Sequence, residues 1–153
     1  MKISIGADHA GYELKRIIHL HLEQKGHVVM NHGTDASEPP ADYPDYARKV
    51  VSSVRSGDCE RGIMVCGSGV GACVAANKFP GVRAGLCHDT FSARQGVEDD
   101  DVNVLCLGAR VVGSSLALAI VDAWLEARFS DATRHRTRLE KVKAIEKEFL
   151  KDG

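Results

Sequence analysis

The segment Gly62-Ile63-Met64-Val65-Cys66-Gly67-Ser68-Gly69-Val70-Gly71 joins an apolar run to a glycine-rich loop. The apolar run, residues 62–66, is typical of a central parallel strand that helices cover on both faces. Alternate glycines then allow a sharp turn and leave backbone N–H groups unobstructed. Residues 72–78 follow with the composition of a short helix. This order predicts a strand–loop–helix unit of a doubly wound α/β fold.

The alternation of strand and helix continues on both sides of this unit. Further strands are predicted at residues 2–6, 27–30, 82–87 and 102–107, and further helices at residues 11–25, 44–56, 90–97, 114–127 and 133–150. We therefore expect one domain over residues 1–153, a three-layer αβα arrangement around a Rossmann-like five-stranded parallel sheet, closed by a C-terminal helix. An apolar stripe in that last helix can face the sheet or a neighbouring subunit: Leu139, Val142, Ile145 and Phe149.

Composition excludes several classes of function. The net charge of -1 provides no overall field toward nucleic acid or an anionic membrane. No run approaches the roughly 18 apolar residues of a membrane span, and the N-terminal apolar run is too short for a signal peptide. The 5 cysteines are an odd set without metal-ligand spacing, so we expect reduced thiols in the cytoplasm and no metal site.

Ligands of doubly wound folds bind at the carboxyl ends of the strands, where the glycine loop is predicted to lie. Its exposed N–H groups, followed by a helix N-terminus, suit an anion or an oxyanion. The spacing is GxGxG, without the lysine of a Walker loop or the GxGxxG of dinucleotide folds. A tight turn of any doubly wound domain explains the glycines about as well.

Cys66 makes the loop more specific, because it ends the strand and faces the loop amides and the following helix. Both features favour a thiolate by lowering the pKa of the thiol. A cysteine in an apolar strand is usually a small hydrophobe, and that interpretation is retained for the other four: Cys59, Cys73, Cys87 and Cys106.

Asp8 and His9 follow the first strand directly. This pair could handle a hydroxyl proton and a phosphate, respectively. Asp8 could equally cap the next helix by accepting hydrogen bonds from its free N–H groups.

A basic cluster opens the last helix, with Arg134 and Arg138 four residues apart on one face. Guanidinium groups match phosphate geometry, and Arg110 lies after the fifth strand, at the expected edge of the sheet. A solvated helix face is the usual alternative. A thiolate base, a set of amides for an enediolate and an arginine clamp would together suit an aldose–ketose phosphate isomerase. A non-catalytic module that binds a phosphorylated ligand is the competing hypothesis.

The chain also resembles the RpiB/LacA/LacB family of sugar-phosphate isomerases over nearly its whole length. The resemblance rests on five ordered stretches, at residues 6–11, 42–47, 65–71, 75–84 and 103–113. It implies interconversion of ribose 5-phosphate and ribulose 5-phosphate, or of a tetrose, allose or galactose phosphate. It further implies no metal or organic cofactor, and a homodimer or homotetramer whose subunits share active sites.

Residue roles follow from the same resemblance. It implies that Cys66 is the catalytic base, that Asp8 assists ring opening and that His9 binds phosphate. The loop Gly67, Ser68, Gly69, Val70 and Gly71 matches the enediolate site, with Ser68 where many members have threonine. Arg110, Arg134 and Arg138 match the remaining anion contacts.

One position departs from the family pattern. Asp99 stands where many members have a histidine that helps to open the sugar ring, and the resemblance implies that Asp100, directly after it, binds the substrate. A carboxylate is normally ionised at neutral pH and cannot donate a proton, unless burial or the neighbouring Asp100 raises its pKa. We therefore expect either weakened ring opening or a shifted substrate. A tetrose 4-phosphate fits the second option, because its 4-oxygen carries the phosphate and cannot close the usual furanose.

Overall fold

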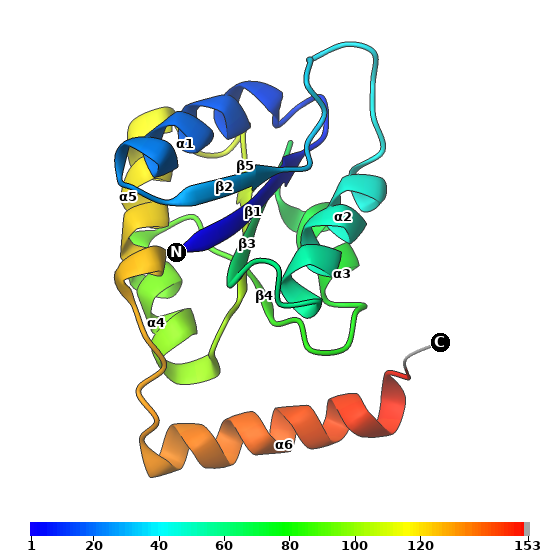
Figure 1. Cartoon of the computed structure of the whole chain (residues 1–153). Helices are drawn as coiled ribbons and strands as arrows, with labels where there is room; N and C mark the ends of the chain where they lie inside the picture. The colour runs from blue at the N-terminus through cyan, green and yellow to red at the C-terminus, as the bar shows by residue number, and fades with distance from the viewer. Residues whose placement is uncertain (152–153) are drawn as a thin grey trace.

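The computed structural model describes residues 1–151 as a parallel sheet with helices on both faces, plus a separate terminal helix (Figure 1). The strands are β1 (Lys2–Ala7), β2 (Val28–Asn31), β3 (Arg61–Cys66), β4 (Ala84–Leu86) and β5 (Val104–Gly108). The helices are α1 (Tyr12–Gln24), α2 (Tyr43–Arg55), α3 (Val70–Ala76), α4 (Thr90–Asp100), α5 (Ser114–Glu126) and α6 (Thr133–Phe149). The predicted α/β class is confirmed.

The strand order β2-β1-β3-β5-β4 places β3 at the centre of the sheet. All neighbouring strands pair in parallel, and Cys66 at the end of β3 lies level with Gly108 at the end of β5. The loops after β1, β3 and β5 therefore meet at one edge of the sheet. We call this edge the carboxyl edge.

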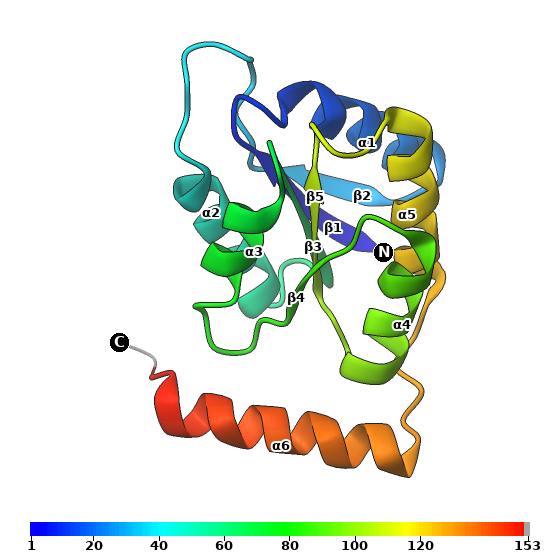
Figure 2. The ribbon, with the colours of Figure 1, turned by 180° about the vertical axis from the view of Figure 1, so that it is seen from behind.

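The side chains of β3 alternate between two hydrophobic clusters. Ile63 and Val65 belong to the larger cluster, which α1, α4 and α5 cover. Met64 and Cys66 belong to the smaller cluster under α2 and α3. Figures 1 and 2 show these helices on opposite faces of the sheet. The three predicted layers are thus present, and burial on both faces explains why β3 has no polar residue after Arg61.

Helix α6 lies outside the three layers, at the opposite edge from the carboxyl edge (Figures 1 and 2). A groove of about 460 Å³ separates part of it from the segments that precede β4 and β5. Leu139 is buried, whereas Val142, Ile145 and Phe149 are 50%, 60% and 71% exposed. Most of the predicted stripe therefore does not pack on the sheet of its own chain.

Most elements differ from the sequence-based prediction by one to three residues at an end, and α3, β4 and α4 are the instructive cases. Helix α3 begins at Val70 rather than at residue 72, because Gly69 adopts a left-handed conformation and the helix starts directly after it. Strand β4 is shorter than predicted and lies at the edge of the sheet, with a neighbour on one side alone. Helix α4 continues through its acidic end to Asp100, and Asp101 ends it with a φ of 52°. Among residues 1–151, no helix has both the length and the apolar character needed to cross a bilayer.

Candidate active site

A pocket of about 340 Å³ opens at the carboxyl edge of the sheet. It brings together residues from the loops after β1, β3 and β5 and from the start of α2, namely Asp8, His9, Ala10, Tyr43, Cys66, Gly67, Ser68, Gly71, Arg110 and Val111. Seven of the predicted substrate-binding or catalytic residues therefore line one cavity.

Cys66 forms the floor of this pocket and is 4% exposed. Its Sγ accepts a hydrogen bond of 3.2 Å from the backbone N–H of Gly69. Gly69 can reach the sulfur because its φ of 78° turns the chain back over the end of β3. The glycine loop therefore places a backbone donor directly beside the sulfur.

The glycine loop presents further amides to the pocket. The hydroxyl of Ser68 accepts a hydrogen bond of 3.2 Å from the N–H of Val70, which closes the turn before α3. Within residues 1–151, the amides of Gly67 and Ser68 donate to no other group. These two amides are therefore available as donors to a negatively charged oxygen. The side chain of Val70 does not line the pocket and is 52% exposed.

Asp8 has a structural bond in addition to its place in the pocket. Its Oδ1 accepts a hydrogen bond of 3.0 Å from the N–H of Gly11, the residue before α1, so Asp8 stabilises the turn that leads into the helix. The capping alternative is wrong, because α1 has no side-chain cap. The side chain is 6% exposed and also lines the pocket wall. A carboxylate that is held by one oxygen can still use the other toward a substrate hydroxyl.

His9 is oriented by the loop between β2 and α2. Its Nδ1 lies 3.0 Å from the backbone nitrogen of Ala41 and 3.2 Å from the carbonyl oxygen of the same residue. In the neutral tautomer whose Nδ1 accepts the Ala41 N–H, Nε2 carries the proton and can donate to an anionic ligand.

Lys15 ties the same loop to α1. Its buried Nζ donates to the Asn31 side chain over 3.0 Å and to the Thr34 carbonyl over 2.7 Å. Burial lowers the pKa of this lysine, and the nearby Asp35 partly opposes that effect. Lys15 therefore holds the loop that orients His9 against α1.

Arg110 lies over the glycine loop. Its backbone N–H donates to the Gly67 carbonyl over 2.9 Å. A methyl group added at Gly67 would come within 3.3 Å of its Nη1, so the guanidinium group covers the loop directly. The side chain is exposed and lines the pocket, where a phosphate could reach it.

Four predicted site residues lie elsewhere in the chain. Asp99 and Asp100 end α4, and Arg134 and Arg138 belong to α6. Asp100 borders the groove beside α6, at the edge opposite the pocket. A single chain therefore does not bring these residues to Cys66.

Asp99 is engaged by its own chain. Its Oδ1 lies 3.2 Å from Nε2 of His135, and its Oδ2 accepts a hydrogen bond of 2.6 Å from Gln95. The Nδ1 atom of buried His135 lies 2.6 Å from the hydroxyl oxygen of Ser130. Asp99 thus helps to attach α6 to α4, a contact that the sequence pattern did not indicate.

Tyr43 is a pocket residue that the sequence-based assignment of roles missed. Its ring packs on the backbone of Gly71, where an added methyl group would lie 2.6 Å from the ring carbon Cζ. Tyr43 belongs to the stretch 42–47 on which the family resemblance rests. Its position directly before Pro44, at the start of a helix, was the one sequence feature that could have indicated a place beside the pocket.

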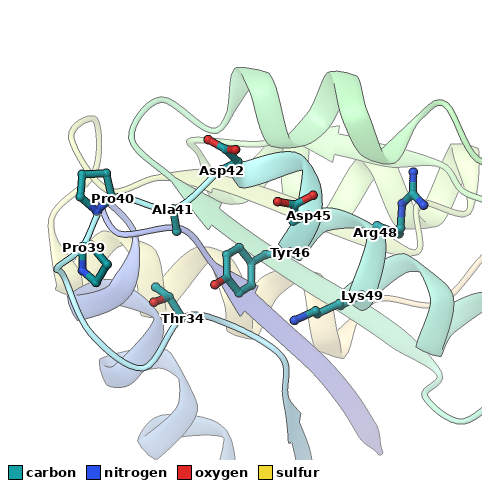
Figure 3. Close-up of a pocket in the computed structure, with 9 residues that line it drawn as sticks. All are labelled: Thr34, Pro39, Pro40, Ala41, Asp42, Asp45, Tyr46, Arg48 and Lys49. Carbon is teal, nitrogen blue, oxygen red and sulfur yellow. The ribbon is translucent and has the colours of Figure 1, made fainter.

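A second, larger pocket of about 800 Å³ borders the first (Figure 3). Its charged groups are the carboxylates of Asp42 and Asp45 and the cations of Arg48 and Lys49. Ala41 lines this pocket and also donates to His9, so the loop between β2 and α2 separates the two cavities. The opposite charges balance, and we assign no ligand to this second pocket.

Comparison with known proteins identifies the family. The Ribose/Galactose Isomerase family matches residues 3–142. Ribose-5-phosphate isomerase B of Escherichia coli is 47% identical over 145 residues, covering 95% of this chain and 96% of the relative. D-erythrulose-4-phosphate isomerase of Pectobacterium atrosepticum is 43% identical over 129 residues, covering 84% and 85%.

A solved structure agrees with these sequence relatives. Ribose-5-phosphate isomerase B of Clostridium thermocellum superposes with a TM-score of 0.94 at 50% identity, covering 97% of this chain and 99% of the other. The fold is that of ribose-5-phosphate isomerase B structures, and the sequence relatives define the class as sugar-phosphate isomerases. The chain belongs to the ribose/galactose isomerase family.

Proposed function

We propose that this protein interconverts ribose 5-phosphate and ribulose 5-phosphate, with Cys66 as the base that moves a proton between C1 and C2. The observation that carries the proposal is the position of the Cys66 sulfur, buried on the pocket floor beside the glycine-loop amides. The activities named for the two sequence relatives support the same reaction class.

The pocket residues divide the reaction between them. The Cys66 thiolate removes the proton from C2 of the open-chain aldose, and the resulting enediolate oxygen accepts hydrogen bonds from the amides of Gly67 and Ser68. The thiol then returns the proton to C1, while the proton of the O2 hydroxyl moves to O1, and the ketose forms. His9 and Arg110 bind the anionic end of the substrate, while Asp8 accepts a proton during ring opening.

A test of the base uses proton exchange. Cys66→Ala should abolish exchange of the C2 proton with deuterated water, while binding of ribose 5-phosphate persists. Cys59→Ala is the matched control, because Cys59 is also buried but does not line the pocket. Wild-type exchange in the Cys66→Ala variant would exclude the assigned role, whereas loss of exchange in both variants would point to general damage.

We further propose that two chains complete each site. Arg134 and Arg138 are exposed on α6, far from the pocket of their own chain. The same helix exposes an apolar stripe that a second copy would bury: Val142, Ile145 and Phe149. A homodimer, alone or paired into a homotetramer, would place the arginines over the partner's pocket as a phosphate clamp.

Mixing two inactive variants tests this arrangement. Cys66→Ala and Arg138→Ala chains, unfolded together and refolded, should form mixed dimers in which one site has both residues intact. Random pairing would restore about a quarter of the wild-type sites. Failure to regain activity in a verified mixed dimer would mean that both residues serve the same chain's site.

The contact of Asp99 favours a tetrose 4-phosphate as a second candidate substrate. Because both carboxylate oxygens already have partners within the chain, Asp99 is poorly placed to replace a ring-opening histidine. A substrate that cannot form the usual furanose would not need that help. The D-erythrulose-4-phosphate isomerase relative supports this option.

The two substrates can be separated with an Asp99→His variant. Its activity should rise with ribose 5-phosphate relative to erythrose 4-phosphate, while Asp99→Asn, which keeps a hydrogen-bonding oxygen toward His135, should show no such shift. If Asp99→His gains nothing with the cyclic sugar, the idea that Asp99 limits ring opening is wrong.

All five cysteines carry free thiols in the described chain. Free thiols are maintained in a reducing compartment. We therefore place the enzyme in the cytoplasm, and fractionation of cells with an antibody to the chain would test this.

A further inference from the structure

The end of β5 extends beyond the strand that pairs with it on one side. Leu86, the last residue of β4, is paired with Cys106, so β4 ends before it reaches the level of Gly108. Successive N–H groups of a strand point to opposite sides, and Ala109 donates to the Cys66 carbonyl on the β3 side. The N–H of Gly108 therefore points to the side where β4 has ended. Gly108 is buried, and a buried N–H without an acceptor is costly.

The imidazole of His88 supplies the missing acceptor. Its Nε2 accepts the N–H of Gly108 over 2.9 Å, so the ring takes the place of a strand carbonyl. A neutral ring that accepts at Nε2 carries its proton on Nδ1. The side chain is half-buried and does not line the active-site pocket. His88 thus holds the peptide between Leu107 and Gly108 from outside the pocket.

The glycine loop packs directly on the peptide that His88 holds. A methyl group added at Gly69 would lie 2.8 Å from the carbonyl carbon of Leu107 and 3.0 Å from the nitrogen of Gly108. A methyl group added at Gly108 would lie 2.5 Å from the carbonyl oxygen of Ser68. No atom fits between the loop and this peptide, so a tilt of the peptide is passed on to Ser68 and Gly69.

This part of the loop provides donors for the reaction. The N–H of Gly69 reaches the sulfur of Cys66 over 3.2 Å. The N–H of Ser68 is one of the two amides available to an enediolate oxygen. Donors of this kind act through a position that is set in advance, so a small displacement lowers the rate of the chemical step. His9 follows β1 on the other side of β3, so its contact with substrate does not depend on this peptide.

We propose that His88 is a positioning residue for the isomerase, whose hydrogen bond to Gly108 holds the Leu107–Gly108 peptide against the glycine loop and so sets the donors of Ser68 and Gly69. This inference rests on the proposed function, which gives those donors their task. The bond needs only an uncharged acceptor at the position of Nε2. A side chain with such an acceptor should therefore replace histidine, whereas an apolar side chain should not.

Two substitutions separate the acceptor from the bulk of the side chain. His88→Leu removes the acceptor, and His88→Gln keeps one on a side chain of comparable reach. With ribose 5-phosphate as substrate, His88→Leu should lower kcat by about tenfold or more and change KM by less than about twofold. His88→Gln should keep kcat close to the wild-type value. His19→Leu is the matched control, because it removes a histidine that contacts Glu23 on the exposed face of α1. Equal losses of kcat in His88→Leu and His88→Gln, or no loss in either, would overturn the proposal.

Nuclear magnetic resonance tests the same link without substrate. The wild-type protein labelled with ¹⁵N should show a scalar coupling between the Gly108 amide nitrogen and Nε2 of His88, transmitted through the hydrogen bond. The amide resonances of Ser68 and Gly69 should shift in His88→Leu and return toward their wild-type positions in His88→Gln. An absent coupling, or unchanged Ser68 and Gly69 resonances in His88→Leu, would overturn the inference even in an active enzyme. A wild-type protein that shows the coupling and these shifts but does not isomerise ribose 5-phosphate would support the positioning link and refute the proposed substrate.

Discussion

Replacing Gly69 with alanine tests how tightly the active-site loop is fitted to the sheet. Gly69 has a φ of 78°, a conformation that L side chains rarely adopt. An added methyl group would lie 2.6 Å from Cδ1 of Leu86, 2.8 Å from the carbonyl carbon of Leu107 and 3.0 Å from the backbone nitrogen of Gly108. The leucine side chain can move aside, but the two β5 backbone atoms belong to a strand in the centre of the core.

The expected loss of stability has two parts. The left-handed backbone costs an alanine about 1–2 kcal/mol. Overpacking against atoms that cannot move costs about 1–3 kcal/mol more. Gly26→Ala is the matched control, because Gly26 has a φ of 86° but no atom within 4 Å of the added methyl group. The control should therefore lose only the stability that the left-handed backbone costs, about 1–2 kcal/mol.

Urea unfolding at one fixed protein concentration measures both variants. Gly69→Ala should lose more free energy of unfolding than Gly26→Ala by about 1–3 kcal/mol. It should also lower kcat, because a displaced Gly69 N–H no longer reaches the sulfur of Cys66. Equal losses of stability with unchanged kcat would refute the argument that close contact with β5 holds the loop in its working conformation.

Two further predictions concern the pocket wall and acid stability. Tyr43→Ala removes the ring that packs on Gly71 and should raise KM by roughly tenfold or less. Tyr43→Phe keeps the ring and should keep the wild-type KM. Equal KM values in the two variants would contradict the packing role. Burial and the nearby Lys49 lower the pKa of His32 below its ordinary value of 6.5. The unfolded chain then binds more protons than the folded chain between that lowered pKa and 6.5, so stability falls as the pH decreases through this window. Urea titrations from pH 7.5 to 5 should show a smaller fall in His32→Gln, and identical pH dependences would exclude His32 as a contributor.

The order of elements was predictable because it depends on local patterns. Residues 62–66 are apolar throughout, which identified the central strand before its neighbours were known. The end of α4 was not predictable, because acidic residues after Val97 hide the helical periodicity. Tertiary contacts continue that helix: Glu98 accepts the N–H of Ser130, and Asp99 faces His135. A single sequence does not show such partners.

The site was predictable to the extent that it follows strand ends. Asp8, Cys66 and Arg110 each follow or end a strand, and parallel topology brings all three to the carboxyl edge. Arg138 was proposed from its charge and helical spacing and from the resemblance, but it belongs to α6, which lies at the opposite edge.

The position of α6 has an evolutionary consequence if each pocket is completed by a second copy. A substitution in this helix then alters the chemistry of the neighbouring subunit and leaves the pocket of its own chain unchanged. After gene duplication, the two copies could still form mixed dimers. In such a dimer, the altered arginines of the diverging copy would complete the active site of the original copy. A new substrate preference could therefore spread only after the exposed stripe of Val142, Ile145 and Phe149 had changed enough to separate the two lineages.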